Sequence, residues 1–290
     1  MAAKFGPAGN SNSFKEQKGK THADIVQFVK QMGLDAYEYQ CGRGVKIGEA
    51  AARAFGDVAA AQGLALSLHA PYYISLSSVE PEKRDNSIRY ILQSAAAAKA
   101  MGAARIVVHA GSCGKLDRAE ALALAKDTLS RALAAMDEQG LGDVTVCPET
   151  MGKVGQLGTL EEVLALCSLD ERLLPCIDFG HLNARTFGGL RTRADYEAVF
   201  DAVENALGAD RMRRYHAHFS KIEYTQKGGE KMHLTFADTV YGPDFEPVLD
   251  LTAQKNCSPV IICESAGTQA EDAATMKAYY EGLIGTGHRE

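Results

Sequence analysis

The sequence predicts a (β/α)8 TIM barrel, and three observations lead to this fold class. Six short apolar runs each end in a histidine or a carboxylate, a pattern typical of buried parallel strands with polar ends. Their terminal residues follow one another in steps of 40, 40, 29, 40 and 46 residues, which is room for a strand, a helix and two loops. The chain has 290 residues, and such barrels typically have about 250. We therefore expect a single domain over residues 1–290.

Eight strands and about eight helices can be placed in order along the chain. We expect strands at 4–7, 35–40, 64–69, 105–109, 143–149, 173–178, 214–218 and 260–264, and helices at 22–32, 47–62, 80–101, 122–136, 159–167, 196–207, 245–255 and 270–283. Thr21 and Asp24 have the spacing of a capping box at the first helix, and Gly33 and Gly63 follow helix ends. The polar segments 10–20 and 220–244 are expected to be loops. Because no Gly-x-Gly-x-x-Gly motif follows the first strand, a nucleotide-binding open sheet is disfavoured.

Composition limits the classes of protein to consider. The longest apolar stretches are too short to span a bilayer, and the N-terminus lacks the apolar region of a signal peptide. The seven cysteines are an odd number and include no Cys-x-x-Cys pair, which indicates a reducing compartment and disfavours a cysteine-rich zinc site. We expect a cytoplasmic monomer that does not bind membranes. The net charge of -6 argues mildly against nucleic acid as a partner.

Nine residues with metal-binding side chains stand at or near the predicted strand ends. In a barrel the carboxyl ends of the strands form one mouth, so residues that are distant in sequence converge there. The expected ligands are His69, His109, Glu149, Asp178, His181, His218, Glu230, His233 and Glu264. His216 and His218 face the same side of one strand, and we favour His218 because it is nearer the mouth.

The number and type of these residues predict the metal. A carboxylate that ends an otherwise buried run, such as Glu149, needs a partner or a metal. Imidazole and carboxylate without thiolate suit zinc or manganese better than magnesium or calcium. One catalytic metal takes about three or four protein ligands, so nine candidates predict two or three ions. Clustered ions of this kind are used in phosphoester hydrolysis.

At these residues the chain resembles the endonuclease IV family of apurinic/apyrimidinic endonucleases. His69-Ala-Pro-Tyr72 resembles that family's His-Ala-Pro-Tyr after the third strand, and His109-Ala-Gly111 resembles its His-Pro-Gly. Residues 176–182, Cys-Ile-Asp-Phe-Gly-His-Leu, are similar to its Asp-Thr-x-His motif. Pro148-Glu149-Thr150 and Glu264-Ser265 resemble its Glu-Asn/Thr and Glu-Thr segments. The resemblance covers nearly the whole chain in order.

The resemblance implies three zinc ions and a reaction. One ion would be held by His69, His109 and Glu149, a second by Glu149, Asp178, His218 and Glu264, and the third by His181, Glu230 and His233. The family hydrolyses the backbone of double-stranded DNA 5′ to abasic sites, and Tyr72 would pack near the displaced sugar. The third-site segment Glu230-Lys-Met-His233 is one residue longer than the family's Asp-Arg-His. Phosphates could be contacted by Lys115, Arg185, Arg191, Arg193, Lys221, Lys227 and Lys231.

Two other functions remain open at this point. A sugar isomerase or epimerase on the same barrel would use one divalent metal and a pair of glutamates that move a proton. Glu149 and Glu264, the expected catalytic residues, could fill that role, and Glu38 would line the sugar pocket. The chain could also be a metal-binding module without hydrolytic activity. The number of metal ions per chain separates these possibilities.

Overall fold

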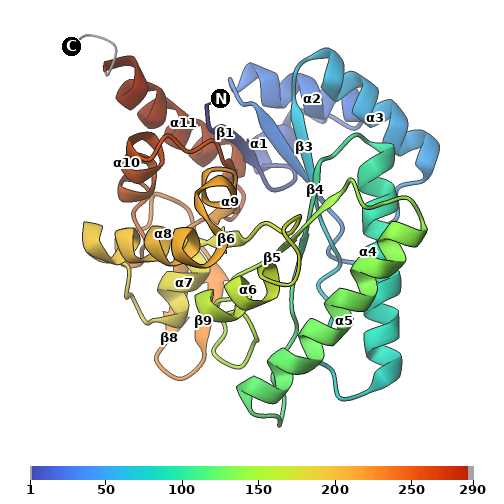
Figure 1. Cartoon of the computed structure of the whole chain (residues 1–290). Coiled ribbons are helices and arrows are strands. Elements are labelled where there is room, and N and C mark those ends of the chain that lie inside the picture. Colours follow the sequence, from blue (N-terminus) through green and yellow to red (C-terminus); the bar gives the residue numbers. More distant parts are fainter. Residues whose placement is uncertain (1, 287–290) are drawn as a thin grey trace.

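Eight parallel strands surround the core and confirm the predicted fold class, in a computed structural model that describes residues 2–286 (Figure 1). Each strand overlaps a run expected from the sequence. The barrel strands are β1 (Lys4–Pro7), β2 (Ala36–Gln40), β3 (Ala65–His69), β4 (Arg105–Val108), β5 (Thr145–Pro148), β6 (Cys176–Asp178), β7 (His216–Phe219) and β10 (Val260–Cys263).

Two seams close the barrel. Continuous ladders run in the order β2-β3-β4-β5 in one half and β1-β10-β7-β6 in the other. At one seam Ala8 forms a parallel bridge with Glu38, and at the other Glu149 forms one with Cys176. The backbone N–H of Thr150 donates to the carbonyl of Cys176 at 3.0 Å. Each seam therefore lies at a glutamate whose side chain is fully buried.

Helices cover the outside of the barrel. They are α1 (Asn12–Glu16), α2 (His22–Gln31), α3 (Glu49–Ala61), α4 (Pro81–Ala100), α5 (Arg118–Glu138), α6 (Leu160–Cys167), α7 (Phe179–Arg185), α8 (Arg193–Leu207), α9 (Ala209–Arg213), α10 (Glu246–Gln254) and α11 (Gln269–Thr286). Figure 1 shows α4 and α5 packed along one flank and α10 and α11 along another. Thr21 and Asp24 form the expected capping box of α2.

Several elements differ from the sequence expectation. Segment 10–20 contains α1, α7 begins directly after β6, and α9 precedes β7. The segment 220–244, expected as a loop, contains an antiparallel hairpin of β8 (Ile222–Thr225) and β9 (Gly229–His233). Its strands are short and mostly polar because only one face packs on the barrel, with Ile222 fully buried. Such a strand has too little apolar periodicity to be recognised in sequence.

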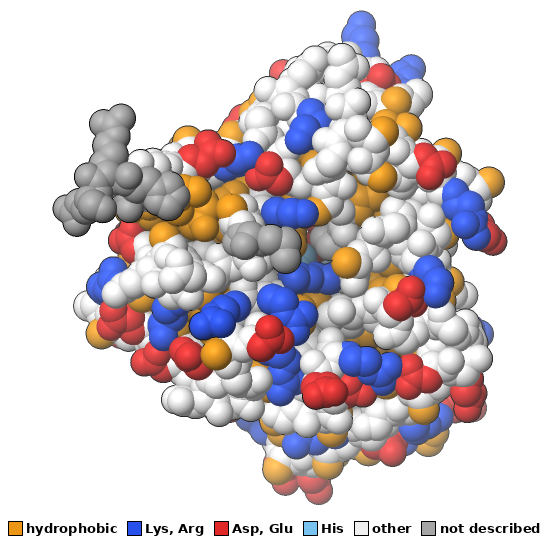
Figure 2. Space-filling view, turned by 45° about the horizontal axis from the view of Figure 1, so that its top comes forward, with side chains coloured by type: hydrophobic (Ala, Val, Ile, Leu, Met, Phe, Trp, Pro, Cys, Tyr) orange, Lys and Arg blue, Asp and Glu red, His pale blue; other side chains and the backbone are white. Residues whose placement is uncertain are grey.

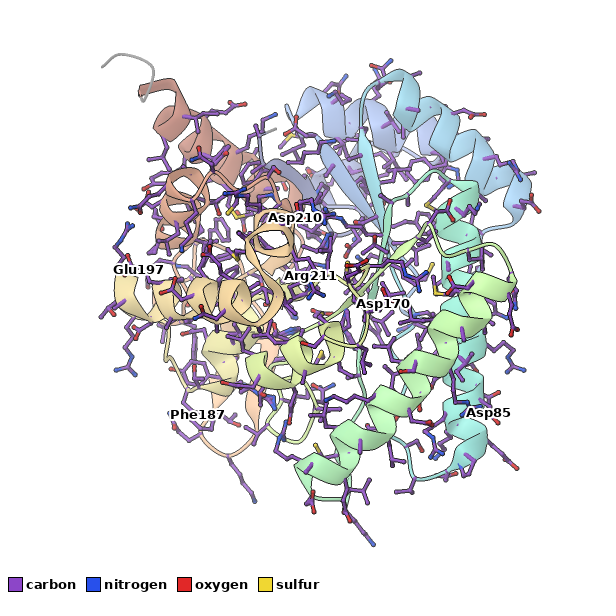
Figure 3. The ribbon with its side chains drawn as sticks, in the orientation of Figure 1. Asp85, Asp170, Phe187, Glu197, Asp210 and Arg211 are labelled. Atoms are coloured by element: carbon purple, nitrogen blue, oxygen red, sulfur yellow. The ribbon has the colours of Figure 1, made fainter. Side chains whose placement is uncertain are left out.

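The side of the barrel where the strands begin is held by side-chain contacts to the main chain. Arg211 of α9 donates to the carbonyls of Cys167 and Asp170 at 2.8 and 3.2 Å, which ties α9 to the end of α6 (Figure 3). All seven cysteines are buried free thiols. Within residues 2–286, no helix has the length and apolar character needed to cross a bilayer.

Candidate metal centre

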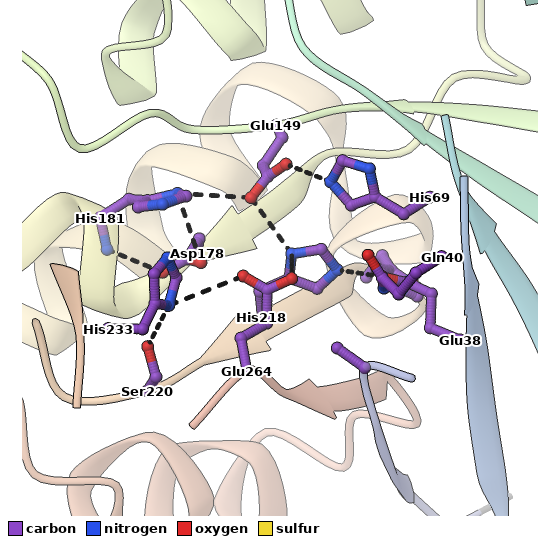
Figure 4. Close-up of polar contacts among 12 residues, drawn as sticks. Glu38, Gln40, His69, Glu149, Asp178, His181, His218, Ser220, His233 and Glu264 are labelled. Atoms are coloured by element: carbon purple, nitrogen blue, oxygen red, sulfur yellow. Dashed lines mark hydrogen bonds and ion pairs between the residues drawn. The ribbon is translucent and has the colours of Figure 1, made fainter. Parts of the chain in front are cut away.

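Glu149, which follows β5, lies at the centre of a group of four histidines (Figure 4). Its Oε2 atom is 2.9 Å from Nε2 of His109 and 3.3 Å from Nε2 of His69. Its Oε1 atom is 3.1 Å from Nδ1 of His218 and 3.3 Å from Nδ1 of His181. These residues come from four different barrel segments, and the strand register brings them together. One carboxylate thus faces two separate pairs of imidazoles.

The hairpin contributes a second group beside His181. Nε2 of His181 is 3.5 Å from Oε2 of Glu230, and Nε2 of His233 is 3.9 Å from Oε1 of the same residue. Ser220 Oγ and His233 Nδ1 are hydrogen-bonded at 2.8 Å. The third predicted ligand set is therefore assembled, although its two hairpin members lie on an element that the sequence analysis expected to be a loop.

Asp178 and Glu264 complete the centre between these groups. Oε1 of Glu264 is 3.6 Å from Nδ1 of His218. Asp178 has one oxygen engaged, because Oδ1 accepts a 2.7 Å hydrogen bond from the backbone N–H of His181 at the start of α7. Its other oxygen, Oδ2, is buried, lies 3.3 Å from Nδ1 of His181 and makes no hydrogen bond within the described chain. A buried carboxylate oxygen without a hydrogen bond is a position that a cation would satisfy.

The histidine contacts also fit a metal. Nδ1 of His69 lies 2.8 Å from the carbonyl of Ala70, and Nδ1 of His181 lies 2.8 Å from the carbonyl of Thr150. Because a carbonyl only accepts, each Nδ1 must have the proton, and the Nε2 of a neutral ring then presents a lone pair. These lone pairs face Glu149 and Glu230, which are also acceptors. An Nε2 lone pair that faces a carboxylate oxygen needs a proton or a metal ion between the two atoms. The tautomer with the proton on Nδ1 leaves Nε2 free to bind a metal.

Electrostatics at the site agree with this requirement. Burial raises the pKa of Asp178 above its usual value. Burial acts to lower the pKa of His69, but its hydrogen bond and charge interaction with Glu149 raise it overall. Burial likewise opposes protonation of His181, and Asp178 with Glu149 outweighs it, so the pKa of His181 lies well above its ordinary value. Burial instead outweighs Glu149 at His109 and lowers the pKa of that residue. Metal binding would displace any proton on a nitrogen that becomes a ligand.

Three groups of ligand atoms lie in this centre, and two of them match the sets implied by the resemblance, while the first has His218 in place of His109. In each, the ligand atoms lie within 4.8 Å of one another: His69, Glu149 and His218; Glu149, Asp178, His218 and Glu264; and His181, Glu230 and His233. His109 is outside these groups but contacts Glu149 directly. All nine expected ligands therefore lie in one contact network. The donor set fits two or three divalent ions.

Tyr72 lies at the rim of this network. Its ring stacks on that of His109 with centroids 5.5 Å apart and meets His69 edge-on at 5.1 Å. The side chain is 55% exposed, so one face remains available to a ligand. Its position is compatible with the expected contact to a substrate sugar.

The structure distinguishes His216 from His218. His218 contacts Glu149 and Glu264, whereas Nε2 of His216 lies 2.9 Å from Oε2 of Glu38. Glu38 is fully buried below the mouth, so the expectation that it would line an open sugar pocket is wrong.

Two residues that hold ligands were missed by the sequence analysis. Thr150 Oγ1 accepts from the backbone N–H of Asp178 at 2.8 Å, and Ser220 bonds to His233. Small hydroxyl residues directly after strand ends were the available signal, but such residues are common in turns.

The basic residues expected near the mouth are largely engaged within the chain. Arg185 donates to carbonyls in the segment 151–156, including 2.7 Å to that of Gln156. Lys221 donates to a backbone carbonyl at 2.6 Å, and Lys231 pairs with Glu223. On the face shown in Figure 2, Lys and Arg side chains gather near the middle but are mixed with carboxylates. That face therefore has no strongly cationic surface that would indicate binding of nucleic acid.

Comparison with known proteins places the chain in a family. The sequence profile of the xylose isomerase-like TIM barrel family matches residues 26–281. The chain belongs to this family. An uncharacterised protein of Methanocaldococcus jannaschii is 32% identical over 277 residues, with 96% of this chain and 97% of the relative covered. A probable endonuclease 4 of Staphylococcus carnosus is 27% identical over 162 residues, covering 54% of this chain and 52% of that protein.

Solved structures of other proteins share the fold. Endonuclease IV from Thermus thermophilus superimposes with a TM-score of 0.68 at 20% identity, covering 91% of this chain and 94% of that one. A D-tagatose 3-epimerase-like protein superimposes with a TM-score of 0.72 at 19% identity, covering 98% of both chains. Proteins with this barrel thus include an endonuclease and an epimerase-like protein, so the fold alone does not decide between these activities.

Proposed function

We propose that this chain is a metal-dependent phosphodiesterase that hydrolyses the DNA backbone at abasic sites. The observation that supports it best is the third ligand group. His181, Glu230 and His233 lie within ligand distance of one another in addition to the groups around Glu149. A single-metal isomerase site does not need these three residues, whereas a phosphodiesterase with clustered ions does.

In this function the chain provides binding and orientation. Bound zinc or manganese would neutralise charge that develops on the phosphate and lower the pKa of a water molecule. Glu149, by facing both pairs of histidines, sets the spacing between neighbouring ions. Glu264 and Asp178 neutralise the excess positive charge in a site that is otherwise rich in imidazole. The exposed face of Tyr72 would pack against the sugar at the lesion.

The similarity to probable endonuclease 4 sequences supports the DNA substrate, and the clustered ligand groups support hydrolysis of a phosphodiester. The decisive experiment is incubation of the purified, metal-loaded chain with a labelled duplex that contains one abasic analogue. We expect a single cut at the lesion that a strong chelator abolishes and added zinc or manganese restores. An undamaged duplex of the same sequence is the control. Failure to cut the abasic duplex with two or three ions bound would refute the proposed substrate.

An epimerase is the second candidate because one ligand group also fits it. Glu149, Asp178, His218 and Glu264 form a carboxylate-rich set for a single ion. Two of its members are glutamates that could move a proton between faces of a ketose. Elemental analysis that gives one ion per chain, together with solvent hydrogen exchange next to a ketose carbonyl, would favour this alternative. Two or three ions without exchange would exclude it.

A further inference from the structure

A second buried carboxylate lies directly beneath the metal centre. Glu38 of β2 is fully buried, and its oxygens are surrounded by donors (Figure 4). Oε2 accepts from Ser67 Oγ at 2.8 Å and faces Nε2 of His216 at 2.9 Å. Oε1 accepts from the amide of Gln40 at 3.3 Å. Three partners hold this buried carboxylate in one orientation, so the positions of its two oxygen atoms are fixed.

His218 lies between this carboxylate and the metal centre. Its Nδ1 faces Glu149 at 3.1 Å and Glu264 at 3.6 Å, which are both expected metal ligands. Its Nε2 lies 2.9 Å from Oε1 of Glu38 on the opposite edge of the ring, and it makes no hydrogen bond to any other atom of the described residues. A neutral imidazole has one lone pair and one N–H. If the N–H points to Glu38, the lone pair of Nδ1 points into the centre.

The geometry of this inner group favours the same arrangement. Oε2 of Glu38 is already engaged by Ser67 and His216, so Oε1 is the oxygen that faces Nε2 of His218. Nδ1 of His218 faces the two carboxylates of the metal centre instead.

We propose that Glu38 is a positioning residue that fixes the tautomer and orientation of His218, so that Nδ1 is presented to the metal. Ser67 and His216 keep Glu38 in place, and His216 acts as their partner rather than as a metal ligand. Carboxylates that accept from the second nitrogen of a metal-binding histidine raise the basicity of that ligand. The inference rests on the metal centre of the proposed function but not on which reaction the centre performs.

A competing use of the same side chains defines the test. Ligand atoms of Cys176, His216 and His218 also lie within 4.8 Å of one another, and all three residues are fully buried. Nδ1 of His216 and Nε2 of His218 are buried and make no hydrogen bond within the described residues, so these two nitrogens could hold a metal ion there. A cobalt-substituted protein distinguishes the two arrangements, because a cobalt–thiolate bond produces an intense near-ultraviolet absorption. We expect no such band, and a band that disappears in Cys176→Ser would overturn the proposal.

The affinity experiment compares Glu38→Gln with the wild-type chain. Gln keeps the shape of the side chain but removes its charge. We expect cobalt to bind about 10–100-fold more weakly, the range measured when such supporting carboxylates are lost. Tyr215→Phe is the matched control, because it removes a buried 3.0 Å contact to Thr252 on the neighbouring position of the same segment. That variant should lose some stability and retain wild-type cobalt affinity.

A nitrogen-15 spectrum of histidine in the metal-loaded wild-type chain provides a readout that does not depend on any variant folding. We expect His218 to have a protonated Nε2 and a metal-bound Nδ1, whereas the opposite pattern would overturn the proposal. Ser67→Ala should weaken cobalt binding in the same direction as Glu38→Gln, by a smaller factor. A folded Glu38→Gln chain with wild-type affinity would also overturn it. A wild-type chain that binds no metal would instead refute the proposed function, so the two failures are distinguishable.

Discussion

The expected metal ligands at the ends of barrel strands differ from the two on the hairpin in burial and in the strand pairing that supports them. His69, Asp178 and His218 are at most 2% exposed. Parallel ladders flank the strands of His69 and His218 on both sides, and the strand of Asp178 has a ladder on one side and a single bridge on the other. Glu230 and His233 have side chains 14% and 26% exposed, and their strand β9 pairs only with β8 and a single bridge to the β5–α6 loop. The first group is preorganised by the fold, whereas the second depends on an added element. Metal occupancy is therefore expected to be lost from the hairpin first.

Replacing Glu149 should produce the largest effect, because it acts on both pairs of histidines. In Glu149→Gln we expect the metal content to fall by at least two ions and cleavage of an abasic duplex to fall about a thousandfold, which corresponds to about 4 kcal/mol of transition-state stabilisation. Elemental analysis and cleavage assays measure these quantities. A variant with full metal content would contradict the central position of Glu149.

The comparison between the two groups predicts a smaller, selective effect at the hairpin. In His233→Ala we expect the loss of about one ion, because a single site takes about three or four ligands and this one would retain two. In His69→Ala the ion lost should be a different one. Competition with a graded series of chelators would resolve the sites by affinity. Loss of all ions from His233→Ala would show that the hairpin is not an independent unit.

Gly152 offers a way to displace the hairpin without removing any ligand. A Cβ atom at this position would lie 2.6 Å from Cβ of Glu230 and 2.9 Å from Cδ2 of His181, closer than real contacts allow. In Gly152→Ala we expect Glu230 to shift, the third ion to be lost, and stability to fall by about 1–3 kcal/mol. Gly155→Ala is the matched control, since a Cβ there meets no atom within 4 Å. Equal metal content in both variants would contradict the tight fit.

The smallest expected effect concerns the loop against which the hairpin pairs. Glu162 accepts from Arg118 and from the backbone N–H groups of Gly158 and Thr159. Burial acts to raise the pKa of Glu162, but these partners outweigh it and lower the pKa overall. Its stabilisation is therefore complete above the unfolded pKa of about 4.3 and lost as the pH falls below it.

Glu162→Gln should therefore be less stable than the wild-type chain by about 1–3 kcal/mol at neutral pH, because buried donors lose their partner. The difference in melting temperature should shrink as the pH falls below about 4.3. Thermal unfolding measured across this range tests the sign. A difference that grows at low pH would contradict it.

The barrel and the strand-end ligands could be predicted because both follow from one repeating pattern. Apolar runs that end in His69, Glu149 or Asp178 fix the strand, its direction and the end at which the side chain lies. The two-residue period of a strand puts His216 and His218 on the same side, and the pairing of His218 with Glu149 followed from its position nearer the mouth. These signals are local in sequence, and the closed barrel brings the side chains at the strand ends close together.

The hairpin and the inner carboxylate could not be predicted in the same way. β8 and β9 are short and mostly polar, so their pairing depends on contacts with the β5–α6 loop that sequence periodicity does not encode. Glu38 stands in an apolar run, which indicates burial, but its partners Ser67 and His216 come from other strands. Only the closure of the barrel decides which of them meet.

The two oxygen atoms of the Glu149 carboxylate contact different pairs of histidines, and this affects how the protein acquires metal ions. One oxygen serves His69 and His109, and the other serves His181 and His218. An ion that binds on one side would complete the ordering of this shared group, so an ion on the other side would meet a ligand whose ordering cost is already met. We therefore expect these two ions to be acquired together, while the hairpin ion exchanges separately. When metal is scarce, supply would then set how many molecules have both shared ions.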